Sequence, residues 1–157
     1  MPDYDYEAAM SGILRISEAA VLAIHTAALL AGSEGRVMTN GEMAEFLGAS
    51  EAHLSKVLQR LGRRGIVASI RGPRGGFTLG RPADEITLLE VYEAVDGPLR
   101  EATCLLDAPV CRGECVMGEV LAKVNNIVRG HLSETRVSDV RISSEREEAN
   151  AEENNQD

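Results

Sequence analysis

The sequence of 157 residues predicts a mostly α-helical protein with one small β-hairpin and a long helix near its C-terminal end. Aromatic residues make up 3% of the chain and Trp is absent, so the core must come from Leu, Val, Ile and Ala, which favours helices. Apolar residues recur at helical spacing in several segments. Two short apolar segments flank a Gly-rich turn, as in a hairpin.

Three helices are expected in the first half of the chain. The first covers 18–31, where apolar residues form one stripe. Thr39 or Asn40 can cap a second, short helix, and Ser50 can cap a third over 51–61. The expected buried face of the third helix is Leu54, Val57, Leu58 and Leu61. A tight turn of three residues that begins with Gly joins the second helix to the third, which is the pattern of a helix-turn-helix.

A hairpin with a Gly-rich tip is expected directly after the third helix. The first strand covers 66–71 and places Ile66, Ala68 and Ile70 on one face, and residues 77–79 form the return strand. A helix-turn-helix followed by such a hairpin is a winged helix. In that architecture the third helix enters the major groove of DNA, and the hairpin reaches phosphates or the minor groove.

The charge distribution supports a DNA partner despite a net charge of -9. The segment 56–81 holds seven Lys and Arg and no Asp or Glu, whereas the rest of the chain carries 9 basic against 25 acidic residues. A basic segment in an acidic protein indicates one anion-binding surface. The residues expected to contact double-stranded DNA are His53, Ser55, Lys56, Gln59, Arg60, Arg63, Arg71 and Arg74.

A capping box at Thr87 predicts a helix over 87–95, and a longer helix is expected over 116–132. The apolar stripe of the longer helix needs more partner surface than a small winged domain offers, so we expect it to pair with a second copy across a two-fold axis. Packing within one chain is the alternative. The residues expected at the dimer interface are Val120, Leu121, Val124, Ile127 and Val128.

All three cysteines lie in one segment of twelve residues. Six residues separate Cys104 from Cys111 and three separate Cys111 from Cys115, with Pro109 and Gly113 bending the chain between them. Thiolates select zinc, copper(I) or iron–sulfur clusters, and a fourth ligand would come from His, Asp, Glu or an exogenous group. A thiol switch without a metal is the alternative reading.

Composition bounds the remaining function classes. No apolar segment reaches the length of about 18 residues that a membrane span needs, and no basic region precedes the apolar segment 19–31 as in a secretory signal. We therefore expect a cytoplasmic protein without a membrane partner. No nucleophile and base occur at recognisable spacing, so we expect no enzyme. A protein–protein adaptor whose basic segment meets an acidic partner is the alternative from another class.

The expected organisation has five parts. These parts are a mobile N-terminal arm over 1–12, a winged-helix domain over 13–98, a cysteine cluster loop over 99–115, a dimerisation helix and short cap over 116–142, and an acidic disordered tail over 143–157.

Together these motifs resemble the Rrf-two family of bacterial winged-helix transcriptional regulators, over about 13–140. The resemblance is carried by the wing motif 71–77, by Glu85-Ile86-Thr87-Leu88 leading to Glu93-Ala94-Val95, and by the cysteine triplet before the long helix. It implies a homodimeric regulator, such as a repressor, that holds a two-iron or four-iron cluster with the three cysteines and senses iron–sulfur status, redox state or nitric oxide. It also implies Glu18 as the fourth ligand, at the start of the first helix. A zinc-gated or thiol-gated regulator remains the alternative.

Overall fold

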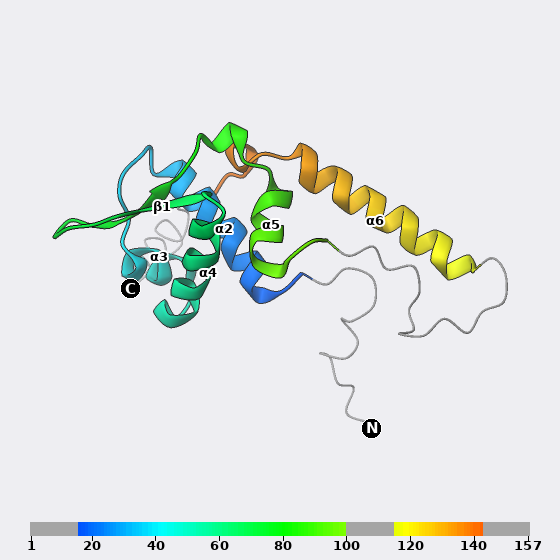
Figure 1. The fold of residues 1–157 in the computed structure, drawn as a ribbon, viewed down its shortest axis with the longest axis horizontal. Helices are drawn as coiled ribbons and strands as arrows, with labels where there is room; N and C mark the ends of the chain where they lie inside the picture. Colours follow the sequence, from blue (N-terminus) through cyan, green and yellow to red (C-terminus); the bar gives the residue numbers. More distant parts are fainter. Residues whose placement is uncertain (1–15, 100–114, 143–157) are drawn as a thin grey trace, which may run out of the picture.

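The computed structural model describes residues 16–99 and 115–142, and it confirms the expected fold class. A small helical body carries a two-stranded hairpin at one end, and the C-terminal long helix runs away from the body at the other (Figure 1). The elements in chain order are α2 (Glu18–Gly32), α3 (Asn40–Leu47), α4 (Glu51–Arg63), β1 (Val67–Ile70), β2 (Gly76–Leu79), η1 (Ala83–Glu85), α5 (Leu88–Asp96), α6 (Val116–Glu134) and η2 (Val137–Asp139).

Side-chain caps fix where the first helices begin. The Ser17 hydroxyl accepts a hydrogen bond from the Ala20 N–H at the start of α2. Thr39, rather than Asn40, caps α3, because the Glu42 side chain bonds back to the Thr39 N–H in a capping box. These hydrogen bonds from the backbone and hydroxyl of Thr39 lower the pKa of the Glu42 carboxyl. The start of each helix is therefore set by local chemistry.

The cap of α5 also ties that helix to the chain that leaves the hairpin. Thr87 and Glu90 form the expected capping box, and the Arg81 guanidinium donates to the Glu90 carboxylate at 2.8 Å. Partial burial raises the pKa of Glu90, but the hydrogen bonds from the Thr87 backbone and from Arg81 outweigh it, and the net pKa is lowered. The ionised carboxylate is the form that holds this junction.

One hydrophobic core lies where α2, α4 and α5 meet. Met43, Leu54, Leu61, Ile66 and Val91 are completely or almost completely buried there. The same core receives Leu132 and Val137, so the end of α6 and η2 pack against the helix-turn-helix. Backbone hydrogen bonds also join the start of α5 to the segment after α6, and the Leu88 N–H donates to the Thr135 carbonyl at 3.0 Å.

The hairpin is antiparallel, with Val67 opposite Leu79 and Ile70 opposite Gly76. Met38 extends this sheet on the far side of β2, because it exchanges two backbone hydrogen bonds with Phe77. Burial along the first strand does not follow the alternation: Ile66 and Val67 are both buried, whereas Ile70 is 45% exposed. Ile70 lies next to the tip, beyond the reach of the core, so its position in the strand pattern does not bury it.

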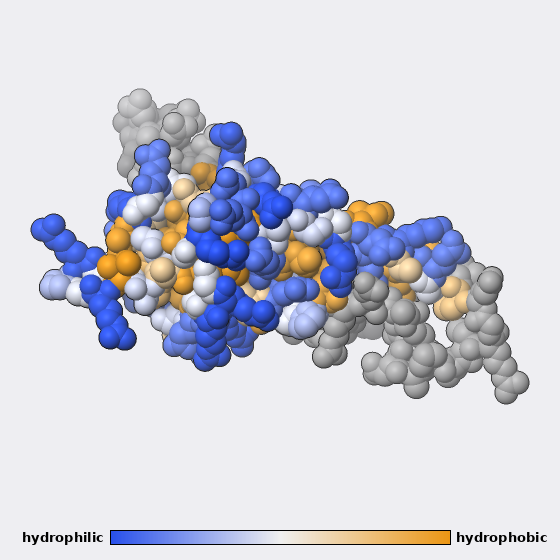
Figure 2. Space-filling model, turned by 45° about the horizontal axis from the view of Figure 1, so that its top comes forward, coloured by the Kyte–Doolittle hydropathy of each residue, from blue (hydrophilic) through white to orange (hydrophobic). Residues whose placement is uncertain are grey.

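The structure divides the apolar stripe of α6 into two sides. Leu121 is completely buried, and Val128 packs against the core of the same chain. Val120 and Ile127 instead remain 41% and 71% exposed, two turns apart on one face, with Met117 continuing the exposed side toward the N-terminal end. Figure 2 shows hydrophobic surface between hydrophilic side chains at the α6 end of the molecule.

Several expectations fall outside the described residues. The arm over 1–12, the acidic tail over 143–157 and all of the cysteine loop except Leu99 and Cys115 are among them. Over the described ranges, no helix has the length and apolarity to cross a membrane.

Candidate nucleic-acid interface

The turn between α3 and α4 is built by one glycine and one serine. Gly48 adopts a left-handed backbone conformation, with φ of 64°, and its N–H closes the end of α3. Ser50 then caps α4 by accepting from the His53 N–H at 3.2 Å. A side chain at Gly48 would be strained at this φ, so glycine permits the abrupt change of direction. The result is the helix-turn-helix predicted from the sequence.

Helix α4 has one buried face and one solvent face. Leu54, Val57, Leu58 and Leu61 fill the core, as expected. The predicted DNA-contacting residues lie on the remaining sides of this helix: Lys56, Gln59, Arg60 and Arg63 are exposed, and His53 and Ser55 are half-buried. Since burial fixes the rotation of the helix, it also fixes which polar side chains face solvent.

Two of these residues have surroundings that the sequence did not indicate. His53 lines a shallow hollow of about 490 Å³ shared with Glu18 and His25 of α2. The Arg60 guanidinium donates to the Val95 carbonyl at 2.9 Å, at the end of α5. This contact directs Arg60 toward α5. The expected contact of Arg60 with DNA stays a prediction, and the Val95 carbonyl competes with DNA for the same guanidinium group.

The hairpin tip presents the two predicted wing arginines to solvent. Arg71 and Arg74 are exposed, Arg71 directly before and Arg74 within a turn that is closed by a 2.9 Å hydrogen bond from the Gly75 N–H to the Gly72 carbonyl. A Cβ at Gly75 would collide with the carbonyl oxygens of Ile70 and Gly72, so only glycine fits this turn. The tight tip therefore holds both guanidinium groups away from the body.

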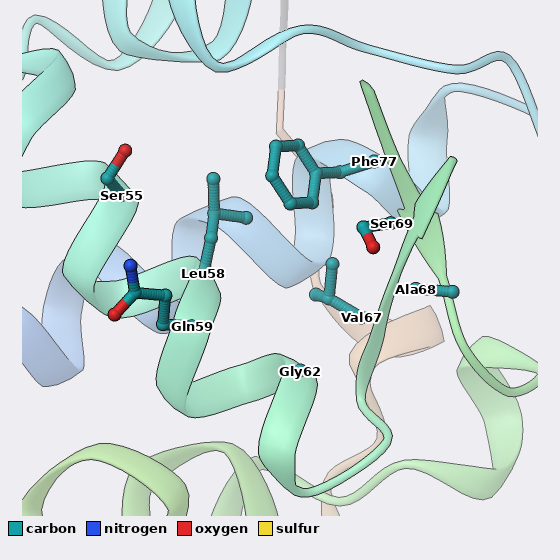
Figure 3. Close-up of a pocket in the computed structure, with 8 residues that line it drawn as sticks. All are labelled: Ser55, Leu58, Gln59, Gly62, Val67, Ala68, Ser69 and Phe77. Carbon is teal, nitrogen blue, oxygen red and sulfur yellow. The ribbon is translucent and has the colours of Figure 1, made fainter. Parts of the chain in front are cut away.

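A hollow of about 460 Å³ separates the solvent face of α4 from the hairpin. Figure 3 shows Ser55, Leu58, Gln59 and Gly62 on the α4 side and Val67, Ala68, Ser69 and Phe77 on the hairpin side. None of these lining side chains carries a charge, and the serine hydroxyls and the Gln59 amide supply hydrogen-bonding groups. The hollow is thus an uncharged recess of mixed character, with apolar walls from Leu58, Val67 and Phe77 beside these polar groups.

The end of α5 is tied to three other helices, directly before the cysteine loop. Ser17 at the start of α2 donates its N–H to the Asp96 carboxylate at 3.2 Å. Arg60 of α4 binds the Val95 carbonyl, and Arg129 of α6 donates to the Leu99 carbonyl at 2.8 Å. We call residues 95–99 with these three contacts the α5 junction. Sequence reasoning missed it, because its partners are far apart along the chain.

Of the predicted metal ligands, the structure describes Cys115 and Glu18. Cys115 caps α6, and its Sγ accepts a hydrogen bond from the Gly118 N–H at 3.3 Å. Glu18 is exposed in the first turn of α2. Cys104 and Cys111 lie outside the described residues, and within those that are described no three His, Cys, Asp or Glu side chains converge on one metal position.

Comparisons with known proteins agree with this architecture. Residues 16–141 match the model of the Rrf2 family, described as iron-dependent transcriptional regulators. Protein aau3 of Rhizobium meliloti is 38% identical over 89 residues, which are 54% of this chain and 57% of that protein. This chain therefore spans little more than half the length of that relative.

Two solved structures share the fold. CymR, the global cysteine regulator of B. subtilis, is 26% identical, with a TM-score of 0.71 over 81% of this chain and 95% of CymR. IscR of T. potens is 23% identical, with a TM-score of 0.63 over 92% of this chain and 93% of IscR. Members of this group are transcriptional regulators rather than enzymes. Because the family match runs from the start of α2 to the end of η2, we conclude that this chain belongs to the Rrf2 family of iron-dependent transcriptional regulators.

Proposed function

We propose that this protein is a homodimeric regulator that binds double-stranded operator DNA and senses iron–sulfur status, redox state or nitric oxide through a cluster on Cys104, Cys111 and Cys115. One observation carries the DNA part. Lys56 and Gln59 are exposed on α4, Gln59 lines the recess beside the hairpin, and Arg71 and Arg74 are exposed at the hairpin tip. A helix fits the major groove, and cations beside it can bind phosphates of the same duplex.

The exposed side of α6 supports the homodimer. Val120 and Ile127 are large apolar side chains on one face of a helix that projects from the body. Two copies that join these faces about a two-fold axis would remove both from water and would present two α4 helices to one DNA molecule. Such dimers read half-sites about 34 Å apart, so a palindromic operator is expected.

The described donor groups fit a thiolate-held cluster. The α6 N-terminus favours negative charge on the Cys115 sulfur, and thiolate is the form that binds iron. The Glu18 side chain is exposed, so its carboxylate could provide the fourth ligand, an oxygen, to a cluster held by the cysteines of a partner copy. A bound cluster would supply a centre whose charge changes with oxidation and which oxygen or nitric oxide can destroy.

The α5 junction offers a route from the cysteine loop to the DNA-binding face. The loop begins at Leu99, whose carbonyl accepts a hydrogen bond from Arg129, and the preceding turn contacts Arg60 of α4 through the Val95 carbonyl. A displacement of the loop would therefore change both contacts. Moving a two-state equilibrium from 1:99 to 99:1 needs about 5.5 kcal/mol of differential binding, which metal–thiolate bonds can supply.

DNA binding can be tested by fluorescence anisotropy with duplex DNA over a range of salt concentrations. Lys56→Ala and Arg74→Ala should each weaken binding and reduce the slope of log affinity against log salt by about one. Lys123→Ala is the matched control, because Lys123 lies on α6 and pairs with Glu119 at 2.7 Å. Equal effects of all three variants, or no binding by the wild type, would remove the DNA proposal.

The cluster can be tested by purifying the protein without oxygen and measuring absorbance, iron and sulfide. Visible absorbance with stoichiometric iron and sulfide is expected, and Cys111→Ala should abolish it while the far-ultraviolet circular dichroism is retained. A colourless protein with stoichiometric zinc would replace the cluster by a zinc-gated regulator. If Glu18→Ala leaves the absorbance and its decay in air unchanged, Glu18 is not a ligand.

A further inference from the structure

One side chain links α3 to the DNA-facing side of α4. Asn40 is the first residue of α3, and its amide nitrogen donates to the Glu51 carbonyl at 3.0 Å and to the Ser55 hydroxyl at 3.2 Å. Both partners belong to α4. The contact joins residues 15 positions apart, and neither the cap of α3 nor that of α4 requires it.

The chemistry of the partners fixes the orientation of this amide. The Glu51 carbonyl can only accept, so the amide atom that faces it must be nitrogen. The two hydrogens of that nitrogen are then used by Glu51 and Ser55. The Asn40 Oδ1 atom is buried and has no partner within the described part of the chain. Burying the Oδ1 atom without a partner has a desolvation cost, and the two hydrogen bonds that the amide nitrogen donates offset it.

The hydrogen bond from Asn40 orients the Ser55 hydroxyl group. Its oxygen accepts from Asn40, so its own hydrogen points elsewhere, and accepting a hydrogen bond makes a hydroxyl a stronger donor. Ser55 lines the recess between α4 and the hairpin, as Gln59 does on the next turn of the helix (Figure 3). The Ser55 oxygen keeps one lone pair, but the bond from Asn40 polarises its O–H group, which favours donation over a second accepted bond.

We propose that Asn40 is a positioning residue that makes Ser55 a hydrogen-bond donor toward DNA. The inference rests on the proposed function of α4 as the DNA-reading helix. The partner of Ser55 is a hydrogen-bond acceptor, either on a base edge or on a phosphate. On a base edge, guanine O6 and N7 or thymine O4 would be preferred over the N4 amino group of cytosine.

The experiment begins with a preferred site, selected by the wild-type protein from random duplex DNA. The affinities of wild type, Ser55→Ala, Asn40→Ala and Asn40→Asp are then measured on that site and on all its single-base substitutions. Ser55→Ala identifies the contacted base pair, since it should flatten the preference at one position of each half-site. One hydrogen bond corresponds to about a three- to tenfold preference.

Asn40→Asp is the informative variant, because a carboxylate has no hydrogen to donate. The Ser55 hydroxyl would then donate to Asp, and its oxygen would face DNA as an acceptor. At the position that Ser55→Ala identified, the affinity for duplexes with cytosine should rise by about three- to tenfold relative to those with guanine or thymine. Ala52→Asp, at an exposed position in the first turn of α4, adds the same charge and should lower affinity for all sequences equally.

The remaining variant and outcomes separate the two proposals. Asn40→Ala should flatten the preference without reversing it, and it provides a test if Asn40→Asp fails to fold. If Ser55→Ala weakens binding to all sequences equally, the acceptor is a phosphate. Asn40→Asp should then weaken binding to all of them by more than Ala52→Asp does, and Asn40→Ala should weaken it relative to the wild type. If the Asn40 variants match their controls while Ser55→Ala changes binding, the positioning role is overturned. If Ser55→Ala, Lys56→Ala and Gln59→Ala all leave DNA binding unchanged, α4 is not the reader and the proposed function fails.

Discussion

Replacement of Ile127 by alanine tests whether the exposed side of α6 is the dimer interface. Ile127 is 71% exposed in one copy, the largest exposure among the large hydrophobic residues that the structure describes. Full burial of such a side chain contributes about 1.5–3 kcal/mol, so the surface still exposed accounts for about 1–2 kcal/mol in each copy. A two-fold interface counts it twice, which gives about 2–4 kcal/mol, or a dimer Kd raised about 30- to 1,000-fold.

The measurement is sedimentation equilibrium of the wild type and the variant over a wide range of concentrations. Ile70→Ala is the matched control, because Ile70 is also exposed, at 45%, but lies on the hairpin. Its dimer Kd should equal that of the wild type. Leu121→Ala should instead lower the free energy of unfolding, since Leu121 is already fully buried in one copy.

The reasoning would be refuted if Ile127→Ala changes the dimer Kd by less than about threefold, well under the range derived from its exposure. An equal effect of Ile70→Ala would also refute it, because the loss would then follow general apolar surface rather than the α6 face. A wild-type protein that stays monomeric at all accessible concentrations would remove the homodimer itself.

Three further predictions concern the winged domain. Leu54→Ala should lower the free energy of unfolding in urea by about 2–5 kcal/mol, whereas Lys56→Ala in the same helix should change it by less than about 0.5 kcal/mol; equal losses would contradict the assignment of faces. Arg60→Met should lower the free energy of unfolding by about 1–2 kcal/mol, because it removes the charged donor that binds the Val95 carbonyl. The salt dependence of its DNA binding should stay unchanged, and a slope reduced by about one would show a phosphate contact instead. Glu90 has a pKa below its ordinary value of 4.5, so it stabilises the fold above that value and the contribution disappears as pH falls through the lowered pKa. In urea unfolding, the free energy of unfolding of Glu90→Gln should therefore fall less as the pH is lowered than that of the wild type. If the two free energies fall in parallel with pH, Glu90 does not make this contribution.

Local signals were sufficient to predict the order of the elements. Ser17, Ser50 and Thr87 cap helices by accepting from residues three positions onward, so each cap and its partner lie in one short segment of sequence. The apolar period of α4 likewise predicted which of its residues are buried. Strand alternation placed Ile66 and Ile70 on one face but did not indicate where the core ends, and Ile66 is buried whereas Ile70 is exposed.

The candidate site was predicted as residue types and not as contacts. The exposure of Lys56, Arg71 and Arg74 follows from the pattern. The contact of Arg60 with Val95 does not, because the two residues are 35 positions apart and a guanidinium group can bind either DNA or a helix end. In the same way, the wing motif and the cysteine spacing indicated the family, while the position of Asn40 at the start of α3 gave no sign of its contact with Ser55.

The sequence by itself determined the helices, the hairpin, the basic segment and the family, since caps, apolar periods and charge depend on residues close together in the chain. Tertiary structure decided which side of α6 is buried in one copy and which side chains meet at the α5 junction. These features depend on how the helices pack, and packing brings together residues whose distance in space is independent of their separation in sequence.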